Sequence, residues 1–210
     1  MTVIQIRNSE RVAFIGATGS GKTVLAKYLL AGLNRVVVLD PKHTFNLPGF
    51  KAGWKLPLTS GDFRLVIRPR GEDDERLAGF LLRLMREGSV TIYCDEAATT
   101  ADVFPETTQV LTEIARTGRE RHVAIWCTMQ RPRRVPLTML TETETFFVFS
   151  VRSKDDRDYI KGYTGDEVTD KLPRFMFWYY RAESDRPALM TLNLKKNQVE
   201  EVNQEVVKNA

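Results

Sequence analysis

One eight-residue stretch constrains this chain more than any other. Residues 16–23 read GATGSGKT and match the phosphate-loop pattern G-x-x-x-x-G-K-[ST] at every fixed position. The apolar run Val12–Ile15 before them is typical of a strand, and apolar residues after them recur at helical spacing. A loop between strand and helix presents backbone N–H groups and the positive end of the helix dipole to a phosphate. The predicted nucleotide-binding residues are Gly16, Ala17, Thr18, Gly19, Ser20, Gly21, Lys22, Thr23 and Val24.

Two side chains of this loop have expected roles. Lys22 would reach the β- and γ-phosphates of a nucleotide, and the Thr23 hydroxyl would hold Mg²⁺. The expected cofactors are therefore ATP and Mg²⁺. The alternative is a glycine-rich turn that binds nothing, and the flanking strand and helix weigh against it.

Length and charge set limits on this interpretation. The chain has 210 residues, which suits one α/β domain, and its net charge of +4 permits a nucleic-acid partner without requiring one. No apolar run approaches the roughly 20 residues of a membrane span, and the N-terminus does not resemble a signal peptide. Cys94 and Cys127 lie in apolar runs, as buried reduced thiols do, so we expect a cytoplasmic protein without a membrane span.

Apolar runs alternate with helical patterns along the chain, which predicts a parallel, doubly wound α/β sheet with helices on both faces. Residues 1–194 form the predicted single domain, with a core at about 10–160 and a C-terminal β-hairpin at about 174–194. Residues 195–210 are a tail, which we expect to be either a surface or partner-binding helix or a frayed end. Residues 2–7 are interpreted as a candidate edge strand, and residues 44–61 as a long loop. The predicted strands are Val12–Ile15, Val36–Leu39, Phe63–Ile67, Val90–Cys94, Val123–Cys127 and Phe146–Phe149, and the predicted helices span about 22–33, 72–86, 105–116 and 155–161.

Asp95 and Glu96 close the apolar strand at 90–94. Asp95 would hold the Mg²⁺ shell, and Glu96 could deprotonate an attacking water. An acidic pair at a strand end is also common as a simple helix cap or loop. Behind a complete phosphate loop, we interpret the pair as the metal-binding and catalytic carboxylates of a nucleotide hydrolase.

Polar and basic residues flank the strand at 123–127. Gln130 follows it and could contact the γ-phosphate through its amide, although a solvated strand end is the alternative. A basic cluster precedes the strand, and one of its members could act as an arginine finger on a neighbouring subunit's γ-phosphate. Such a cluster is usually a solvated face. Our first choice for the finger is Arg119 and our second is Arg116, with Arg121 completing the cluster.

The order GATGSGKT, VVVLDPKHTF, VTIYCDEA and ARTGRERHVAIWCTMQRPRRVP resembles the FtsK–HerA superfamily of P-loop ATPases. The D-P-K and T-x-Q-R-P elements are rarer than the phosphate loop itself, and the resemblance covers about residues 10–160. It implies a RecA-like fold of the additional-strand, catalytic-glutamate type, with strand order 5-1-4-3-2. It also implies a base, a sensor and a trans-acting arginine, which map to Glu96, Gln130 and Arg119.

Members of that superfamily are ring-forming motors that pump double-stranded DNA. The chain shows none of the family's N-terminal barrel, membrane spans or winged helix, so the resemblance favours a minimal ATPase that packages a viral genome. The implied partners are double-stranded DNA, a homo-oligomeric ring of five or six subunits, and a viral capsid or portal protein. A chromosomal or conjugative HerA-like translocase is an alternative. From other classes, a P-loop kinase with Arg131–Arg134 as its lid, or a nucleotide-gated assembly protein, also remains open.

DNA contact can be inferred only from basic loops, whose charges would meet phosphates without reading sequence. Plain surface solubility explains each of them equally well. The candidates are Lys51 and Lys55 around Trp54, Arg68 and Arg70, and Arg131, Arg133 and Arg134.

Overall fold

The protein, described here by a computed structural model, is built around a single mixed sheet. The described residues are 4, 6–7, 9–56, 61–169, 171–184, 186–194 and 198–202, and they contribute ten strands to the sheet. The parallel strands are β1 (Val12–Ile15), β2 (Arg35–Leu39), β3 (Lys51–Ala52), β4 (Phe63–Ile67), β5 (Val90–Cys94), β6 (Val123–Met129) and β7 (Thr145–Val148). The antiparallel strands that extend it are β8 (Met176–Arg181), β9 (Ala188–Asn193) and β10 (Gln198–Glu201).

The strands lie in the order β10-β9-β8-β7-β1-β6-β5-β2-β4-β3. The predicted order 5-1-4-3-2 therefore describes only five inner strands, β7-β1-β6-β5-β2, and not the whole sheet. Strands β4 and β3 continue it at one edge, and three antiparallel strands continue it at the other. The predicted hairpin is thus not a separate appendage, because β8 pairs with β7 as well as with β9.

The beginning and end of the chain differ from expectation. Of the predicted edge strand at 2–7, only residues 4, 6 and 7 are described, and they lie outside any strand. Residues 198–201 of the tail form β10, and not the helix or frayed end that we expected, because β9 offers them an open sheet edge. Residues 203–210 of that predicted helix lie outside the described residues.

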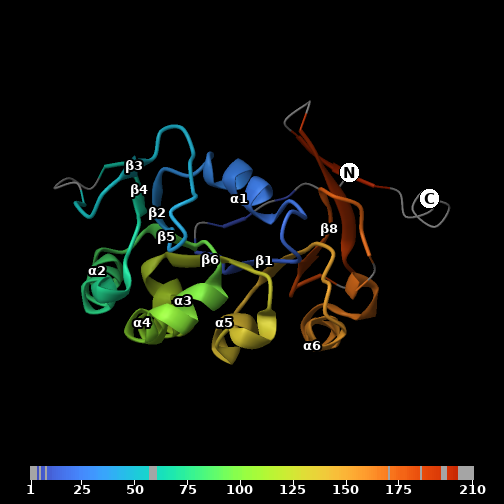
Figure 1. Ribbon diagram of the computed structural model, residues 1–210. Helices are drawn as coiled ribbons and strands as arrows, with labels where there is room; N and C mark the ends of the chain where they lie inside the picture. The colour runs from blue at the N-terminus through green and yellow to red at the C-terminus, as the bar shows by residue number, and fades with distance from the viewer. Residues whose placement is uncertain are drawn as a thin grey trace.

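Helices cover the two faces of the sheet unequally (Figure 1). Helix α1 (Lys22–Leu30) lies on one face, where Leu25, Ala26 and Leu30 are buried, and it ends earlier than the predicted Leu33. The other face carries α2 to α6, of which α3 and α5 were not predicted. Their bounds are α2 Asp74–Glu87, α3 Ala97–Val103, α4 Pro105–Thr117, α5 Leu137–Thr141 and α6 Lys154–Thr164, with short 3-10 turns η1 Gly71–Asp73, η2 Gly118–Arg121, η3 Pro132–Arg134 and η4 Asp166–Thr169.

The core consists of two apolar layers, one on each face of the sheet. Alternate residues of β1 belong to the two layers: Val12 and Phe14 lie in the layer on the α1 side, and Ala13 and Ile15 lie in the other. The ring of Phe14 stacks on Phe147 of the neighbouring strand with centroids 5.0 Å apart. Because β1 is buried on both faces, its position is fixed, and the loop that follows it is fixed with it.

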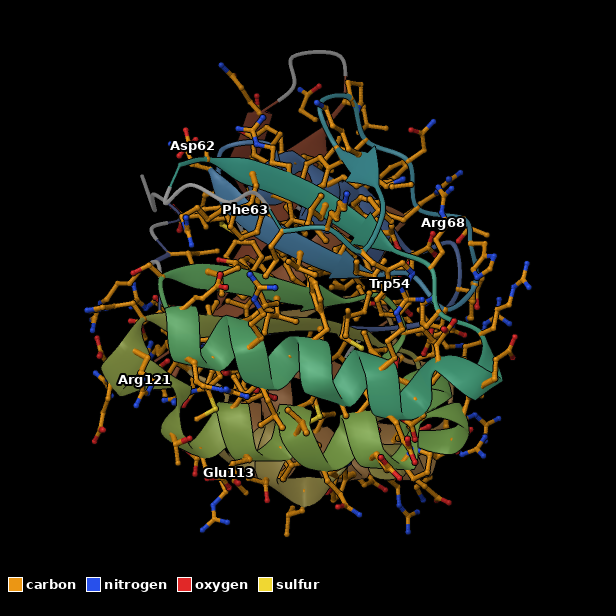
Figure 2. All side chains as sticks on the ribbon, turned by 90° about the vertical axis from the view of Figure 1, so that its left-hand side faces the viewer. Trp54, Asp62, Phe63, Arg68, Glu113 and Arg121 are labelled. Carbon is orange, nitrogen blue, oxygen red and sulfur yellow. The ribbon has the colours of Figure 1, made fainter. Side chains whose placement is uncertain are left out.

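The predicted long loop at 44–61 is held against the body over its described part. Phe45 is buried in the layer on the α1 side, and Lys51–Ala52 add to the sheet edge as β3. The Trp54 ring, labelled in Figure 2, belongs to this segment. It packs edge-on against Phe80 with centroids 6.1 Å apart, and the Arg76 guanidinium lies 4.1 Å from its centroid. Within the described part of the chain, no helix combines the length and apolar character needed to cross a membrane.

Candidate functional site

The predicted chemical groups converge at the carboxyl edge of the parallel strands. The phosphate loop follows β1, Asp95 and Glu96 follow β5, and Gln130 follows β6. Since β6 lies between β1 and β5, Gln130 lies between the loop and the acidic pair. Ligands of open α/β sheets bind at this edge, so the topology places the three predicted motifs in one site.

Backbone hydrogen bonds clamp the start of the phosphate loop. The Gly16 N–H donates to the Met129 carbonyl at 3.0 Å, and the Ala17 N–H donates to the Ser150 carbonyl at 2.8 Å. Gly16 has φ +150°, and a Cβ there would lie 2.7 Å from the Cβ of Phe149. A side chain at this position would therefore displace the strand end that holds the loop, which explains the glycine.

Lys22 is buried in the loop and is hydrogen-bonded to its backbone. Its Nζ donates to the carbonyls of Gly16 at 2.7 Å and Ala17 at 2.9 Å. Burial lowers the pKa of Lys22 from 10.5 to about 8, against the opposing effect of the Glu96 and Asp95 charges. The ammonium is thus desolvated where a phosphate would give it a strong partner.

Asp95 is oriented by two hydroxyl groups. Its Oδ1 accepts hydrogen bonds from Tyr93 Oη at 3.0 Å and from Thr128 Oγ1 at 3.1 Å. Burial raises the pKa of Asp95, and its two hydroxyl donors work in the opposite direction. Oδ2 accepts no hydrogen bond from the described residues, so it can serve as a metal ligand. With the partly exposed Thr23 hydroxyl, this oxygen provides the hard oxygen donors that Mg²⁺ prefers.

Glu96 adopts a left-handed backbone conformation with φ +70° and ψ +77°. Its N–H donates to Thr128 Oγ1 at 2.8 Å, and its carboxylate accepts from Gln130 Nε2 at 2.6 Å and Gln130 N at 3.3 Å. Gln130 Oε1 in turn accepts from Thr18 Oγ1 at 2.7 Å. Gln130 therefore links the phosphate loop to the acidic pair.

Three residues at this site were given no role from the sequence. Thr128 bridges Asp95 and Glu96, and Lys42 Nζ lies 3.5 Å from Glu96 Oε2. The Phe175 N–H donates to the Ser20 carbonyl at 2.9 Å. The D-P-K and T-x-Q-R-P elements pointed to the segments that contain Lys42 and Thr128. Phe175 had no such indication, because it reaches the loop from 155 positions later in the sequence.

A cavity of about 170 Å³ opens beside Ala17 and Thr18 of the phosphate loop. The segments after β6 and β7 complete its wall, with Gln130, Arg131 and Arg152 among its lining residues. It adjoins the Thr18–Gln130 contact from outside the loop. A side chain of another molecule could therefore approach the loop through this opening.

The two finger candidates do not lie at this site. Arg119 belongs to η2, which precedes β6, and Arg116 is in the last turn of α4, so both lie toward the amino edge of the sheet. Figure 2 shows Arg121, from the same turn as Arg119, on the side of the molecule opposite Arg68. Arg119 lies 3.7 Å from Glu144, and Arg116 lies 3.8 Å from Glu113. Neither arginine can serve its own phosphate loop from this position.

The predicted DNA-contacting residues fall in separate places. Lys51 and Lys55 lie on and after the edge strand β3, and Arg68 and Arg70 follow β4. Arg131, Arg133 and Arg134 follow β6, three strands away from β4. Arg68 binds the buried Asp40 at 3.2 Å, while Arg133 pairs with Asp155 at 3.4 Å and Arg134 with Asp102 at 3.1 Å. The basic loops therefore do not merge into one surface, and three of these arginines have acidic partners.

This strand order, with the loop after β1 at the centre of a mixed sheet, is the fold of solved P-loop ATPases. The solved structures that it resembles include the genome packaging NTPase B204 from Sulfolobus turreted icosahedral virus 2 in complex with sulfate. That comparison has a TM-score of 0.67 at 17% identity and covers 88% of this chain and 96% of that one. A second structure is that of B204, the DNA-packaging ATPase from Sulfolobus Turreted Icosahedral Virus. It gives a TM-score of 0.60 at 18% identity and covers 94% of this chain and 98% of that one.

Another ATPase structure is similar as well. EssC (ATPases 2 and 3) from Geobacillus thermodenitrificans gives a TM-score of 0.63 at 15% identity, covering 95% of this chain and 42% of that one. No protein-family model matches the sequence, and a search of curated proteins finds no match. At these identities the likeness establishes the fold.

Proposed function

We propose that this protein is an ATP-hydrolysing, ring-forming motor that translocates double-stranded DNA and packages a viral genome into a capsid. The observation that carries the hydrolytic part is the chain of contacts from Thr18 through Gln130 to Glu96. It places a carboxylate one side chain away from a complete phosphate loop. The similarity to B204 over nearly the full length of both chains supports the packaging role.

Each predicted residue has a place in this chemistry. The loop from Gly16 to Val24 would hold the phosphates, and Lys22 would exchange its carbonyl partners for phosphate oxygens. Thr23 and Asp95 would hold Mg²⁺, which supplies charge neutralisation when bound. Glu96 would take a proton from the attacking water, whose oxygen bonds to the γ-phosphorus as the bond to ADP breaks. Gln130 would contact the γ-phosphate.

The positions of the arginines support a ring. The phosphate loop lies at the carboxyl edge of the sheet and Arg119 at the amino edge, so a neighbour stacked in the same direction could present its arginine to the loop. Arg119 remains our first choice for the trans-acting finger and Arg116 our second. The ring would be a hexamer or pentamer, in the cytoplasm or associated with the virion, and would dock on a capsid or portal protein.

DNA would contact the basic loops without sequence preference. Lys51, Lys55, Arg70 and Arg131 have exposed side chains, and the described residues give none of them an acidic partner. Arg68, Arg133 and Arg134 would have to share their charge with existing ion pairs. Because the contacts are to phosphates, binding should weaken steeply as salt increases.

The decisive experiment measures phosphate release with and without double-stranded DNA, while light scattering reports the oligomer in the same sample. A DNA-stimulated rate in a ring supports the proposal, and Lys22→Ala should abolish it. DNA-independent phosphoryl transfer to a small acceptor would favour a kinase. Nucleotide-dependent assembly without DNA binding at low salt would favour an assembly protein.

The finger is tested by mixing variants. Arg119→Ala rings and Glu96→Gln rings should each be inactive. Mixed rings should regain part of the activity, because an intact Glu96 can then face an intact Arg119 from its neighbour. Arg121→Ala, from the same turn, is the matched control and should keep full activity. Normal hydrolysis by pure Arg119→Ala rings would eliminate this residue and direct the test to Arg116.

A further inference from the structure

Glu96 is contacted from both sides. Because β5 lies between β6 and β2, Gln130 reaches it from one neighbouring strand end and Lys42 from the other. Gln130 donates hydrogen bonds to both carboxylate oxygens, from its side-chain amide to Oε2 and from its backbone N–H to Oε1. Lys42 Nζ shares Oε2 at 3.5 Å.

These contacts restrain the group that must accept a proton. The two oxygens of Glu96 already accept three of the roughly four hydrogen bonds that a carboxylate can accept, so little room remains for an attacking water to donate to it. Departure of Lys42 or Gln130 would free a position on the carboxylate for that water. The partners of Glu96 are an amide and an ammonium, and a nucleotide's terminal phosphate would attract both.

Lys42 is well suited to change partner. Its side chain is 44% exposed, its contact with Glu96 is long, and the described residues offer it no other hydrogen bond or ion pair. Lys42 contacts Glu96, which Gln130 joins to Thr18 of the phosphate loop, so both ammonium groups belong to one connected site. A group that brings several negative charges to Lys22 would therefore attract Lys42 as well.

We propose that Lys42 is a second sensor of the nucleotide's terminal phosphate, which leaves Glu96 for that phosphate when ATP binds and so frees the carboxylate for the attacking water. This inference rests on the proposed ATPase function. It assigns Lys42 a direct contact with the bound nucleotide, whereas a positioning residue would only orient Glu96. ADP lacks the terminal phosphate and would leave Lys42 on Glu96.

The test compares affinities for a non-hydrolysable ATP analogue and for ADP, both with Mg²⁺, by calorimetry. Lys42→Met should weaken analogue binding roughly tenfold, the size expected from loss of one charge-assisted hydrogen bond, and leave ADP binding unchanged. Lys42→Arg should keep most of the preference, because it keeps the cation. Lys154→Met removes an exposed lysine at the same sheet edge and is the matched control. An unchanged ratio of analogue to ADP affinity in Lys42→Met would overturn the proposal.

A second background separates sensing from positioning. Glu96→Gln removes the charge that holds Lys42, so analogue affinity should rise, and adding Lys42→Met should cancel that rise. If Lys42 only orients Glu96, Lys42→Met will have no effect on analogue affinity once Glu96 is neutral. Failure of the wild type to bind or hydrolyse ATP would contradict the proposed function itself. Hydrolysis by the wild type together with an unaltered preference in Lys42→Met would contradict this inference alone.

Discussion

The backbone N–H of Phe175 donates a hydrogen bond to the Ser20 carbonyl at 2.9 Å, which joins the turn before β8 to the phosphate loop. Phe175 has φ +69°, an uncommon conformation for a residue with a side chain. Its ring also lies against Gly21, where an added Cβ would be 2.9 Å from Phe175 Cδ1. The antiparallel extension of the sheet therefore supports the loop that is expected to bind nucleotide.

Gly21→Ala should disturb both the phosphate loop and the turn at Phe175 that packs against it. Gly21 has φ +120°, and the new methyl group would collide with Phe175. We expect a loss of about 1–3 kcal/mol in the free energy of unfolding and weaker nucleotide binding. Urea unfolding and a nucleotide titration measure the two effects. Gly79→Ala, on α2 with no atom within 4 Å of its added Cβ, should instead stabilise slightly; equal behaviour of the two variants would refute the argument.

Thr128→Val should remove the hydroxyl group that holds Asp95 and Glu96 in place. The hydroxyl accepts from the Glu96 N–H and donates to Asp95, and both contacts are buried. Its loss would leave a buried N–H without an acceptor and cost about 1–3 kcal/mol of stability. Turnover should fall as well, because Asp95 loses one of its two orienting hydroxyls. Thr128→Ser keeps the hydroxyl and should retain both stability and rate, as urea unfolding and phosphate release can establish.

Lys22 should make stability depend on pH in the alkaline range. Its pKa is about 8 in the folded protein against an ordinary value of 10.5, so the folded state binds this proton less tightly than the unfolded chain. The resulting destabilisation is fully present below pH 8 and is relieved as the pH rises from 8 toward 10.5.

Lys22→Met should remove this pH dependence. Without nucleotide, its stability relative to the wild type should decrease by about 1–3 kcal/mol between pH 7 and pH 10. Urea unfolding at the two pH values gives the difference. A difference that is the same at both would show that the Lys22 ammonium is not desolvated in the folded state.

Arg68 should affect folding more than DNA binding. Asp40 is fully buried and accepts from the N–H groups of Thr44 and Phe45, each at 3.0 Å, and from Arg68 Nε at 3.2 Å. Arg68→Gln should cost about 1–3 kcal/mol, because a buried carboxylate loses its cation. Arg70→Gln, two residues on and exposed, should change stability by less than about 0.5 kcal/mol. If both variants unfold at the same urea concentration, Arg68 has no anchoring role.

The parts of the fold that were predicted correctly have strong local patterns. Val36–Leu39 is a continuous apolar run and Val90–Cys94 is apolar except for Thr91, as expected for strands buried on both faces. β3 has only two residues, and both are exposed, so no periodicity could reveal it. β10 depends on an edge offered by β9, and α3, with the sequence AATTADV, lacks a clear apolar stripe.

The same distinction applies to the candidate site. Gly16–Thr23 and Asp95–Glu96 can be read from local sequence, because each motif lies between one strand and the segment that follows it. Lys42 and Phe175 contact the site through residues 54 and 155 positions away, and such pairings depend on strand order. The ion pairs of Arg68, Arg133 and Arg134 are long-range in the same sense, so the sequence could not distinguish anchoring arginines from free ones.

The placement of η2 and the phosphate loop at opposite edges of one sheet restricts how copies of this chain can complete each other. In a two-fold dimer every contact is made twice, so a dimer that joined the two edges would complete both sites and leave neither edge free for a third subunit. A head-to-tail contact joins the two edges only once, and it leaves an unused edge at each end until a rotation closes the chain of subunits. Under the proposed function, closure would therefore give every site the same environment, whereas an open assembly would always contain one site without its arginine.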